Sequence, residues 1–277
     1  MIPMKTLAGR VAIVTGGGSG IGRGAALALG KRGVAVTVAD VDAARAAAVA
    51  EEIVAGGGKA AGIACDVSDD SCFELLRDET LSRFGHVHIV MNNAAQVSLG
   101  LPEDMPLSEW QRIIDINLLS IVRSNLAFLP LLIAQGEGHI VNTASFSGLM
   151  TYSFDRLPYA ATKAATVQIS EGLAIYLKPK GIGVTMLCPG PVRTNIMNSV
   201  RSFGSIAEQR TPGPEFALKE PEAVGEQVVE AITSGRFMLP TDEQVIDHLK
   251  ARAGDWDGFI NRQIDQPHIL ARPPSPK

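Results

Sequence analysis

The sequence predicts an α/β protein with a doubly wound, mostly parallel sheet that has helices on both faces. Short apolar runs alternate with longer stretches of helical periodicity, and this order favours β-α-β units with right-handed crossovers. The runs are continuously apolar, which is typical of strands buried on both faces of a parallel sheet. A glycine-rich turn follows the first run. Together these features predict a Rossmann-type fold in a single domain spanning residues 1–277.

Each strand is predicted at an apolar run, and each helix between two such runs. The predicted strands are 10–15, 35–39, 60–65, 89–92, 139–143 and 183–187. The predicted helices are 20–32, 42–55, 69–84, 108–135 and 158–177. Asp42 is well placed to cap the second helix, while Ser108 and Gln111 form a capping-box pattern that predicts the start of the fourth. Pro130 predicts a bend inside that fourth helix.

After residue 187 the alternation loosens. Residues from about 195 to 220 include Gly204, Pro212, Gly213 and Pro214 among scattered apolar side chains, which is too broken a pattern for one long helix. This mixture predicts a mobile flap that closes on an apolar ligand, and a packed surface loop is the alternative. The proline-rich end, from about 265 to 277, is predicted to be a flexible tail.

The composition argues against nucleic acid and membranes as partners. The formal net charge is −4 and the pI is about 5.8, so no basic surface is expected. We expect no membrane span, because no apolar run reaches about 20 residues, and no signal peptide, because the N-terminus lacks an apolar core. The three cysteines, Cys65, Cys72 and Cys188, lack metal-ligand spacing. We therefore predict a metal-free protein in the reducing cytoplasm.

The glycine turn has the spacing Gly16-x-x-x-Gly20-x-Gly22. It follows a buried strand and opens a helix, which is the context that a dinucleotide-binding fingerprint requires. Glycine lets the backbone approach a pyrophosphate, and the helix N-terminus offers free N–H groups and a favourable dipole. We therefore predict cofactor contacts from the turn, at Gly16, Ser19, Gly20, Ile21 and Gly22. The alternative is an ordinary strand-to-helix turn.

Asp40 ends the second predicted strand, about twenty residues past the turn. A carboxylate there can accept hydrogen bonds from the adenosine ribose and repel a 2′-phosphate. Ser19 and Val41 offer no positive charge that would hold such a phosphate. The pattern therefore favours NAD over NADP, although Arg23 and Arg45 leave NADP open as the less favoured cofactor.

Polar residues also follow the third and fourth predicted strands. Ligands of doubly wound sheets lie at the carboxyl ends of the strands. We therefore expect Asp66 and Val67 to contact the cofactor, and Asp66 to receive the adenine amino group. We expect the same general position for Asn93 and Ala94. Asn92 is expected instead to bond to backbone and tie the sheet together.

Further motifs stand in a recognisable order along the chain. Together they resemble the classical short-chain dehydrogenase/reductase family over about residues 5–239. The matching segments are Thr15-Gly16-x-x-x-Gly20-x-Gly22, Asp66, Asn92-Asn93-Ala94, Asn117, Ser145, Tyr159-x-x-x-Lys163 and Pro189-Gly190. Ala95 stands where a glycine is usual. The spacing from Ser145 to Tyr159 is one residue longer than usual, which leaves Ser147 as an alternative to Ser145.

The resemblance implies a catalytic set made of Asn117, Ser145, Tyr159 and Lys163. Tyr159 would act as general acid and base, although a free tyrosine titrates near pH ~10. The charge of Lys163, one helical turn further on, is expected to lower the pKa of Tyr159 together with the charge of the oxidised nicotinamide. Ser145 would hold the substrate oxygen and stabilise charge developing on it. Asn117 would anchor a water that continues the proton path from Lys163.

The resemblance also implies contacts with the nicotinamide half of the cofactor. Lys163 would bond the nicotinamide ribose, and Tyr159 would lie beside it. The segment after the last predicted strand is expected at the nicotinamide. Its contact residues would be Pro189, Gly190, Val192 and Thr194, the last of them bonding the carboxamide.

The predicted function is NAD-dependent hydride transfer to or from a hydrophobic secondary alcohol or ketone. The expected substrate pocket comprises Gln96, Ser98, Phe146, Tyr152, Phe154, Pro191 and the apolar residues Ile196, Met197, Phe203, Ile206 and Phe216 of the flap. The alternatives are an NAD-binding sensor without turnover, and a dehydratase or epimerase on the same scaffold. The very apolar helices predicted at 108–135 and 158–177, with the habit of the family, predict a homotetramer, and a dimer is the alternative.

Overall fold

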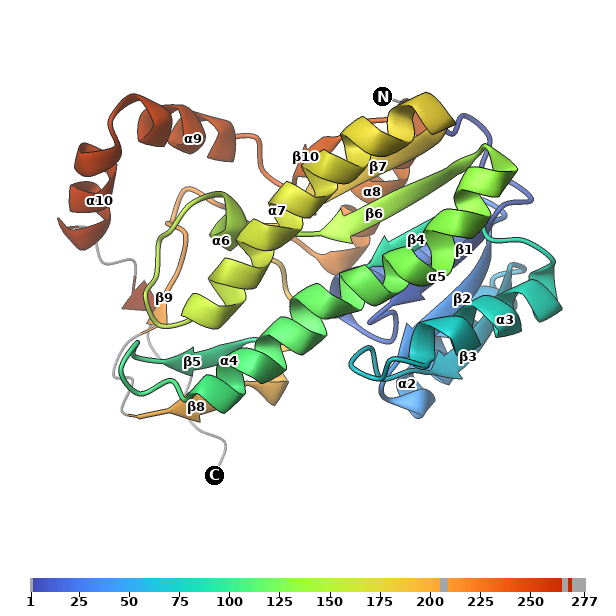
Figure 1. Cartoon of the computed structure of the whole chain (residues 1–277), viewed down its shortest axis with the longest axis horizontal. Coiled ribbons are helices and arrows are strands. Elements are labelled where there is room, and N and C mark those ends of the chain that lie inside the picture. The colour runs from blue at the N-terminus through green and yellow to red at the C-terminus, as the bar shows by residue number, and fades with distance from the viewer. Residues whose placement is uncertain (1, 205–208, 266–268, 271–277) are drawn as a thin grey trace.

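A seven-stranded parallel sheet forms the centre of the protein (Figure 1). The structure is a computed structural model that describes residues 2–204, 209–265 and 269–270. The strands are ordered β10-β7-β6-β4-β1-β2-β3. Their bounds are β1 (Val11–Thr15), β2 (Ala35–Asp40), β3 (Lys59–Ala64), β4 (Ile89–Asn92), β6 (Gly138–Thr143), β7 (Ile182–Cys188) and β10 (Met238–Pro240). The predicted α/β class is confirmed, and of the strands in this sheet the three-residue edge strand β10 was not predicted.

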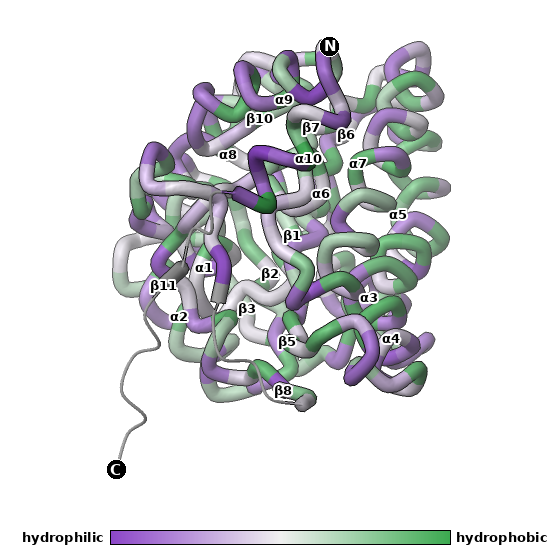
Figure 2. Tube along the Cα trace, turned by 90° about the vertical axis from the view of Figure 1, so that its left-hand side faces the viewer, coloured by the Kyte–Doolittle hydropathy of each residue, from purple (hydrophilic) through white to green (hydrophobic). Residues whose placement is uncertain are grey.

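Helices cover both faces of this sheet, as Figure 2 shows from the side. One layer contains α1 (Gly20–Gly30), α2 (Ala43–Ala55) and α8 (Pro221–Ser234). The other contains α3 (Cys72–Phe84), α5 (Ser120–Gln135) and α7 (Leu157–Leu177), which the 3₁₀ turn η2 (Lys178–Lys180) extends. A separate apolar core lies under each layer.

Helices α1 and α8 approach each other backbone to backbone. A Cβ atom at Gly24 would lie 2.2 Å from the carbonyl oxygen of Pro221, and one at Gly225 would lie 2.2 Å from that of Gly24. Glycine in a helix interior costs about 1 kcal/mol relative to alanine. The close approach of the two helices explains why both carry glycine there.

The long apolar segment predicted at 108–135 consists of three pieces. They are α4 (Leu107–Ile114), a π-helical turn η1 (Asp115–Leu119) and α5. The predicted capping box is wrong, because Pro106 is the N-cap in extended conformation and no side chain caps the helix. Pro130 lies within α5, and the departure from α-helical hydrogen bonding falls at η1 instead.

This segment bears on the expectation that the chain has no membrane span. By length and composition alone, Leu107–Gln135 could cross a membrane, with a mean hydropathy of 1.7 over its most apolar window. The premise that no apolar stretch is long enough to cross a membrane is therefore wrong. Its α5 part nevertheless packs on one face of the sheet, in contact with β4, β6 and α3.

The C-terminal part adds elements beside the sheet. In the predicted flap lie the 3₁₀ turn η3 (Asn195–Ser199), β8 (Arg201–Phe203) and β9 (Gln209–Arg210). Strand β8 pairs in parallel with β5 (Ser98–Gly100), apart from the main sheet. The remaining helices are α6 (Phe146–Leu149), α9 (Val245–Gly254) and α10 (Trp256–Asp265). A third apolar core joins them.

The predicted flexible tail lies mostly outside the described residues. Its described pair, β11 (Ile269–Leu270), runs antiparallel to β9. Ile206 of the predicted flap also lies outside the described residues.

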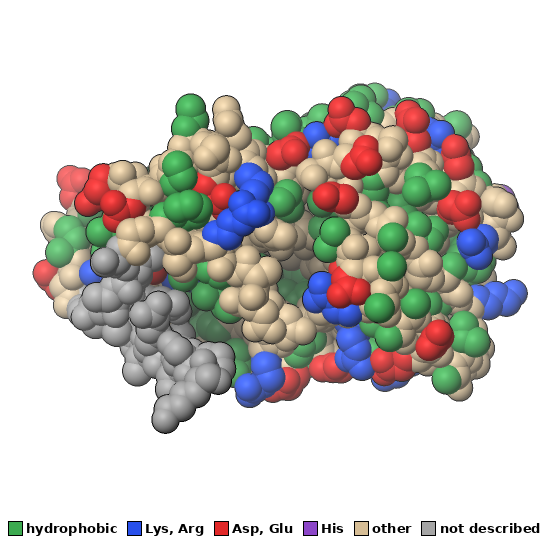
Figure 3. Space-filling view, turned by 90° about the horizontal axis from the view of Figure 1, so that it is seen from below, with side chains coloured by type: hydrophobic (Ala, Val, Ile, Leu, Met, Phe, Trp, Pro, Cys, Tyr) green, Lys and Arg blue, Asp and Glu red, His purple; other side chains and the backbone are tan. Residues whose placement is uncertain are grey.

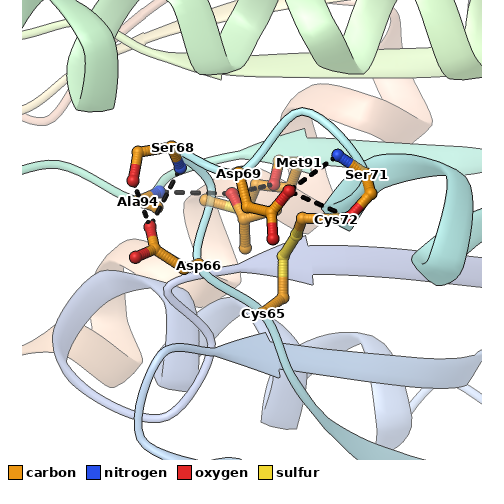
Figure 4. The surroundings of a disulfide bond; sticks show 9 residues. Cys65, Asp66, Ser68, Asp69, Ser71, Cys72, Met91 and Ala94 are labelled. Atoms are coloured by element: carbon orange, nitrogen blue, oxygen red, sulfur yellow. Dashed lines mark hydrogen bonds between the residues drawn. A yellow bond between two sulfur atoms is a disulfide. The ribbon is translucent and has the colours of Figure 1, made fainter.

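A disulfide joins Cys65, just after β3, to Cys72, the first residue of α3 (Figure 4). The Cα atoms are 5.7 Å apart, which is within the range of disulfides. Cys188 is free and buried. A disulfide is unusual in the reducing cytoplasm that the sequence predicts. Asp69 accepts hydrogen bonds from the backbone and side chain of Ser71. Because these residues form a turn, α3 begins at Cys72 rather than at the predicted residue 69.

Candidate active site

A cavity of about 460 Å³ opens at the carboxyl ends of the central strands. The strand order reverses direction between β1 and β4, and doubly wound sheets bind ligands at such a switch point. Figure 3 shows the hollow from this side, with hydrophobic side chains on its floor and charged ones at its rim. The residues that line this cavity are spread along the chain from Gly16 to Ser199.

The glycine turn forms one wall of the cavity. Gly16 and Gly20 have φ angles of +60° and +50°, which residues other than glycine rarely adopt. Gly16, Ser19, Gly20 and Ile21 line the cavity, whereas Gly22 lies behind it. A Cβ atom at Gly22 would lie 2.2 Å from the carbonyl oxygen of Gly16. Gly22 therefore permits close packing of turn on helix rather than touching a ligand.

The N-terminus of α1 faces this wall. Ser19 is its N-cap, has extended backbone, and makes no side-chain capping bond. The hydroxyl and the first N–H groups of the helix are therefore available to an anion. A glycine cradle with such a helix end fits a dinucleotide pyrophosphate.

Asp40 is fixed beside the turn. Its Oδ2 accepts from the backbone N–H of Gly18 at 3.0 Å, and its Oδ1 from that of Asp42 at 3.0 Å. Arg45 lies at the same edge of the cavity, 3.8 Å from the Asp40 carboxylate and 2.9 Å from that of Asp42. The Arg45 guanidinium is thus already paired with carboxylates. Asp42 also caps α2 as predicted, accepting from the N–H groups of residues 44 and 45.

The ends of β3 and β4 supply the next part of the lining. Asp66, Val67, Asn93 and Ala94 all border the cavity. Asp66 Oδ1 accepts from the N–H and hydroxyl of Ser68, which holds this loop in a turn. The site thus includes Cys65 and Ser68, which the sequence argument did not single out.

Asn92 and Asn93 act inside the protein. The Asn92 amide donates to Asn142 Oδ1 at 2.9 Å, so it ties β4 to β6 through a side chain rather than backbone. Asn93 Nδ2 donates to the carbonyl oxygen of Thr15 at 3.1 Å. Asn93 therefore binds the end of β1 and also lines the cavity.

Tyr159 and Lys163 line the far wall from α7. Lys163 is 2% exposed, and its Nζ donates to the carbonyl oxygen of Thr143 at 2.6 Å. That Nζ lies 5.6 Å from the centre of the Tyr159 ring. Ser145 caps α6 by accepting from the N–H of Ser147 at 3.1 Å. The phenol and the ammonium therefore face one cavity, as the helical spacing predicts.

Burial controls the acidity of both groups. It raises the pKa of Tyr159 to about 12, although a hydrogen bond with Ser145 acts to lower it. Burial also lowers the pKa of Lys163 to about 8. The expected lowering of the Tyr159 pKa by Lys163 is therefore not found in the protein alone. The alternative serine, Ser147, bonds the hydroxyl of Tyr152 at 2.8 Å instead.

Asn117 lies in η1, buried behind the cavity. Its Oδ1 accepts from the N–H of Gln96 at 2.8 Å, and its Nδ2 donates to the carbonyl oxygen of Gln96 at 2.9 Å and to Thr162 at 3.2 Å. The side-chain amide is thus occupied by protein groups. A water on the predicted proton path would need the backbone of Asn117 rather than its side chain.

The segment after β7 contributes Pro189 and Thr194 to the lining. Gly190 and Val192 lie outside it. A Cβ atom at Gly190 would lie 2.5 Å from the Phe146 ring, and Val192 bridges to Lys219 in the following loop. These two residues shape the segment from behind.

The predicted substrate residues are only partly at the cavity. Gln96 and Ile196 line it, together with Arg112 and Ile116, which the sequence argument missed. Ser98 and Phe146 are wrong as lining residues, because both are fully buried in the protein interior. No local pattern distinguishes Arg112 from other charged residues on a helix, so the sequence held no signal for it.

Other predicted pocket residues have partners elsewhere. Phe216 is buried against Phe146 at a ring-centre distance of 5.0 Å. Phe154 is 44% exposed and lies 4.6 Å from the Arg210 guanidinium. These aromatic residues join the flap to the body of the protein.

Comparison with known proteins agrees with this geometry. A family model described as short chain dehydrogenase matches residues 10–204. A cyclohexanol dehydrogenase of Acinetobacter sp. (strain SE19) is 31% identical over 239 residues, which cover 86% of this chain and 93% of that protein. A C alpha-dehydrogenase of Sphingobium sp. (strain NBRC 103272 / SYK-6) is 31% identical over 241 residues, which cover 84% of this chain and 79% of that protein.

A solved structure extends the likeness to three dimensions. A short chain dehydrogenase/reductase from Burkholderia phymatum, in complex with NAD, has a TM-score of 0.82 at 27% identity and covers 98% of this chain and 100% of that one. The sequence and structural matches both extend over most of this chain. The chain therefore belongs to the short-chain dehydrogenase/reductase family.

Proposed function

We propose that this chain transfers a hydride between NAD and a hydrophobic secondary alcohol or ketone, with Tyr159 as the general acid and base. Membership of the family makes it an oxidoreductase that acts on CH–OH groups. The observation that carries the finer proposal is the position of Tyr159 and Lys163. Both side chains border the cavity whose opposite wall is the glycine turn.

The residues have separate tasks in this proposal. The bound nicotinamide supplies the hydride acceptor or donor. Ser145 holds the substrate oxygen near the Tyr159 hydroxyl, which takes the proton in oxidation and returns it in reduction. Because the Tyr159 pKa is about 12 in the protein alone, forming the phenolate requires added positive charge. Lys163 binds the nicotinamide ribose and passes protons onward, for which its pKa of about 8 is suitable.

NAD is the proposed cofactor in preference to NADP. Asp40 is held by two backbone N–H groups at the place where a 2′-phosphate would lie, and Arg45 is already paired with Asp40 and Asp42. The proposed cofactor contacts remain those of the glycine turn, Asp40, the ends of β3 and β4, Tyr159, Lys163 and the segment 189–194. Gly22, Gly190 and Val192 act from behind the surface. Titration with NAD and with NADP, with the quenching of Trp fluorescence as the measure of binding, tests this preference.

A neutral, apolar substrate is proposed from two supports. Ile116 and Ile196 line the cavity together with Arg112, whose charge is paired with a buried carboxylate. The relatives include a cyclohexanol dehydrogenase. We therefore expect cyclic or aryl-bearing secondary alcohols to be accepted before phosphorylated or acidic ones.

A homotetramer in the cytoplasm is also proposed. Large apolar side chains are exposed on the outer layer, including Leu107, Leu126 and Ile175 at 72%, 74% and 78%. These residues lie on α4, α5 and α7, and a surface of this kind favours association. Light scattering tests the assembly, and a stable monomer would remove it.

The decisive experiment is an NADH-absorbance screen of alcohols that includes cyclohexanol, with Tyr159→Phe as the control. NADH formation that depends on Tyr159 supports the proposal. Tight NAD binding without NADH formation from any alcohol would favour a sensor. Conversion of substrate without net NADH would favour a dehydratase or epimerase.

A further inference from the structure

Glu109 in α4 is a buried carboxylate that the proposed reaction does not use. It is 3% exposed. Its two oxygens accept from Arg112 Nε at 3.0 and 3.1 Å, and Oε1 accepts from Arg112 Nη2 at 2.6 Å. Oε1 also accepts from the Ser98 hydroxyl, and Oε2 lies 3.4 Å from Arg201 Nη1. Four donor atoms of three side chains, on α4, β5 and β8, therefore converge on one carboxylate.

These contacts join the flap to the body of the protein. Ser98 begins β5 and Arg201 begins β8, and the two residues are paired in the small parallel sheet. Figure 1 shows this sheet beside α4 and apart from the central sheet. Strands of three residues form few hydrogen bonds and are marginal on their own. Glu109 therefore supplies a side-chain link where the backbone pairing is weak.

The same cluster reaches the proposed catalytic helix. Arg112 lines the cavity, and its Nη1 donates to Gln96 Oε1. The backbone of Gln96 is bonded on both sides to the Asn117 amide, which donates in turn to Thr162. The Thr162 hydroxyl donates to the carbonyl oxygen of Tyr159 at 2.8 Å. A continuous series of hydrogen bonds thus runs from the cluster to the backbone carbonyl group of Tyr159.

Charge balance explains why the carboxylate is tolerated inside. Burial acts to raise the pKa of Glu109, but hydrogen bonds from Arg112 and Ser98 and the charges of Arg112 and Arg201 outweigh it, so the pKa is lowered. Glu109 is therefore ionised at neutral pH. Its negative charge offsets that of Arg112, which lines the cavity.

We propose that Glu109 is a positioning residue for the substrate. It holds β8 against β5 through Arg201, and it cancels the charge of Arg112 so that the cavity accepts a neutral alcohol. The second part rests on the proposed function, because it takes the cavity as the place where alcohol binds. The first part concerns the fold of the flap and stands without turnover.

The first test measures amide hydrogen exchange of residues 201–203 in the full chain. Glu109→Gln keeps the shape and removes the charge, and Arg201→Gln removes the partner that is 61% exposed and tolerant of change. We expect exchange to be about tenfold faster with Glu109→Gln and about threefold faster with Arg201→Gln, since charged hydrogen bonds contribute more when one partner is buried. Arg201→Lys should restore most of the protection.

A matched control removes an arginine of a different surface pair. Arg32, in the turn after α1, bonds Glu226 of α8 at 2.5 Å. Exchange at 201–203 in Arg32→Gln should stay within about twofold of the wild type, as expected for an exposed pair far from the flap. Equal exchange in Arg201→Gln and wild type would overturn the role of Glu109 in holding β8, whether or not Glu109→Gln folds.

The second test uses a matched pair of substrates, cyclohexanol and 4-hydroxycyclohexanecarboxylate. In Glu109→Gln the Arg112 charge is uncompensated. The KM of the neutral alcohol should rise about tenfold with kcat little changed, which is the sign of lost binding. The kcat/KM of the carboxylate should rise relative to that of the neutral alcohol. An unchanged ratio would overturn the charge-cancelling role.

The two proposals fail in different ways. If the wild type oxidises no alcohol, the proposed function fails, while the exchange measurement still decides whether Glu109 holds β8. If the wild type oxidises cyclohexanol and both Glu109→Gln and Arg201→Gln behave as it does, the function stands and the positioning role is lost.

Discussion

The two halves of the cavity are built in different ways. The adenosine end of the cofactor half is built from backbone and short contacts around the glycine turn, such as the bond between Gly18 and Asp40, which are 22 residues apart. The substrate half depends on side chains from distant segments, such as Arg112 in its lining and the Glu109–Arg201 pair behind it, whose members are 92 residues apart. Glycine spacing is visible in a sequence, whereas a cluster of charged side chains is not. The comparison predicts that the halves can be damaged separately.

The largest separable effect should come from Tyr159→Phe. Loss of a general acid and base typically costs about 10²- to 10⁴-fold in rate. We expect kcat to fall by that factor while NAD still binds within about tenfold of the wild-type Kd, because the glycine turn does not depend on the phenol. Steady-state kinetics and fluorescence titration measure the two quantities. Joint loss of binding and rate would contradict the separation of the halves.

Gly22→Ala should damage the cofactor half alone. The new methyl group would lie 2.2 Å from the carbonyl oxygen of Gly16 and 2.7 Å from Asn93 Nδ2. Overpacking of this kind costs about 1–3 kcal/mol or more. We expect lower stability in urea unfolding and weaker NAD binding.

Gly172→Ala in α7 is the matched control for that change. A Cβ atom at Gly172 would meet nothing within 4 Å. Replacing glycine in a helix should therefore stabilise the protein by about 0.5–1 kcal/mol. If both variants lose stability equally, the close contact at Gly22 is not the cause.

The disulfide at the edge of the cofactor half gives the next effect. Cys65 and Cys72 close a loop across a sequence separation of 7. A disulfide that closes so short a loop contributes about 2–3 kcal/mol in the chain-entropy model. Cys72→Ser should lower the free energy of unfolding by up to that amount, and a reductant should have the same effect on the wild type only. A wild-type unfolding curve that ignores reductant would contradict this expectation.

The smallest effect concerns pH and the buried Lys163. Its pKa is about 8 in the folded protein, against an ordinary value of 10.5. Between these values the unfolded chain binds more protons, so the free energy of unfolding should rise with pH. Cys188 and Tyr159, whose pKa values are raised to about 12, oppose this as the pH approaches and passes their ordinary values of 9.0 and 10.0.

Urea unfolding at pH 8 and pH 9 can detect this contribution. The rise should be present in the wild type and reduced in Lys163→Met, which cannot titrate. An identical pH dependence in the two proteins would show that Lys163 keeps its ordinary pKa in the fold.

Local signals were predicted well and non-local ones poorly. The Asp42 cap was predicted correctly because its acceptor and donors lie within three residues of one another. The Ser108 capping box failed because Pro106, with its fixed φ, started the helix one residue earlier. The disulfide was missed because the proximity of Cys65 and Cys72 depends on how β3 and α3 are joined by the Asp66 and Asp69 turns.

The amino-acid order alone determined the alternation of strands and helices, the position of the glycine turn and the helical spacing that puts Tyr159 and Lys163 on one face. Each of these follows from steric and hydrogen-bonding preferences over a few residues. Only the tertiary structure decided which side chains surround the substrate side, the union of β5 with β8, and the acidity of Tyr159. Burial and charge pairing arise from residues brought together across the whole chain, and no local pattern encodes them.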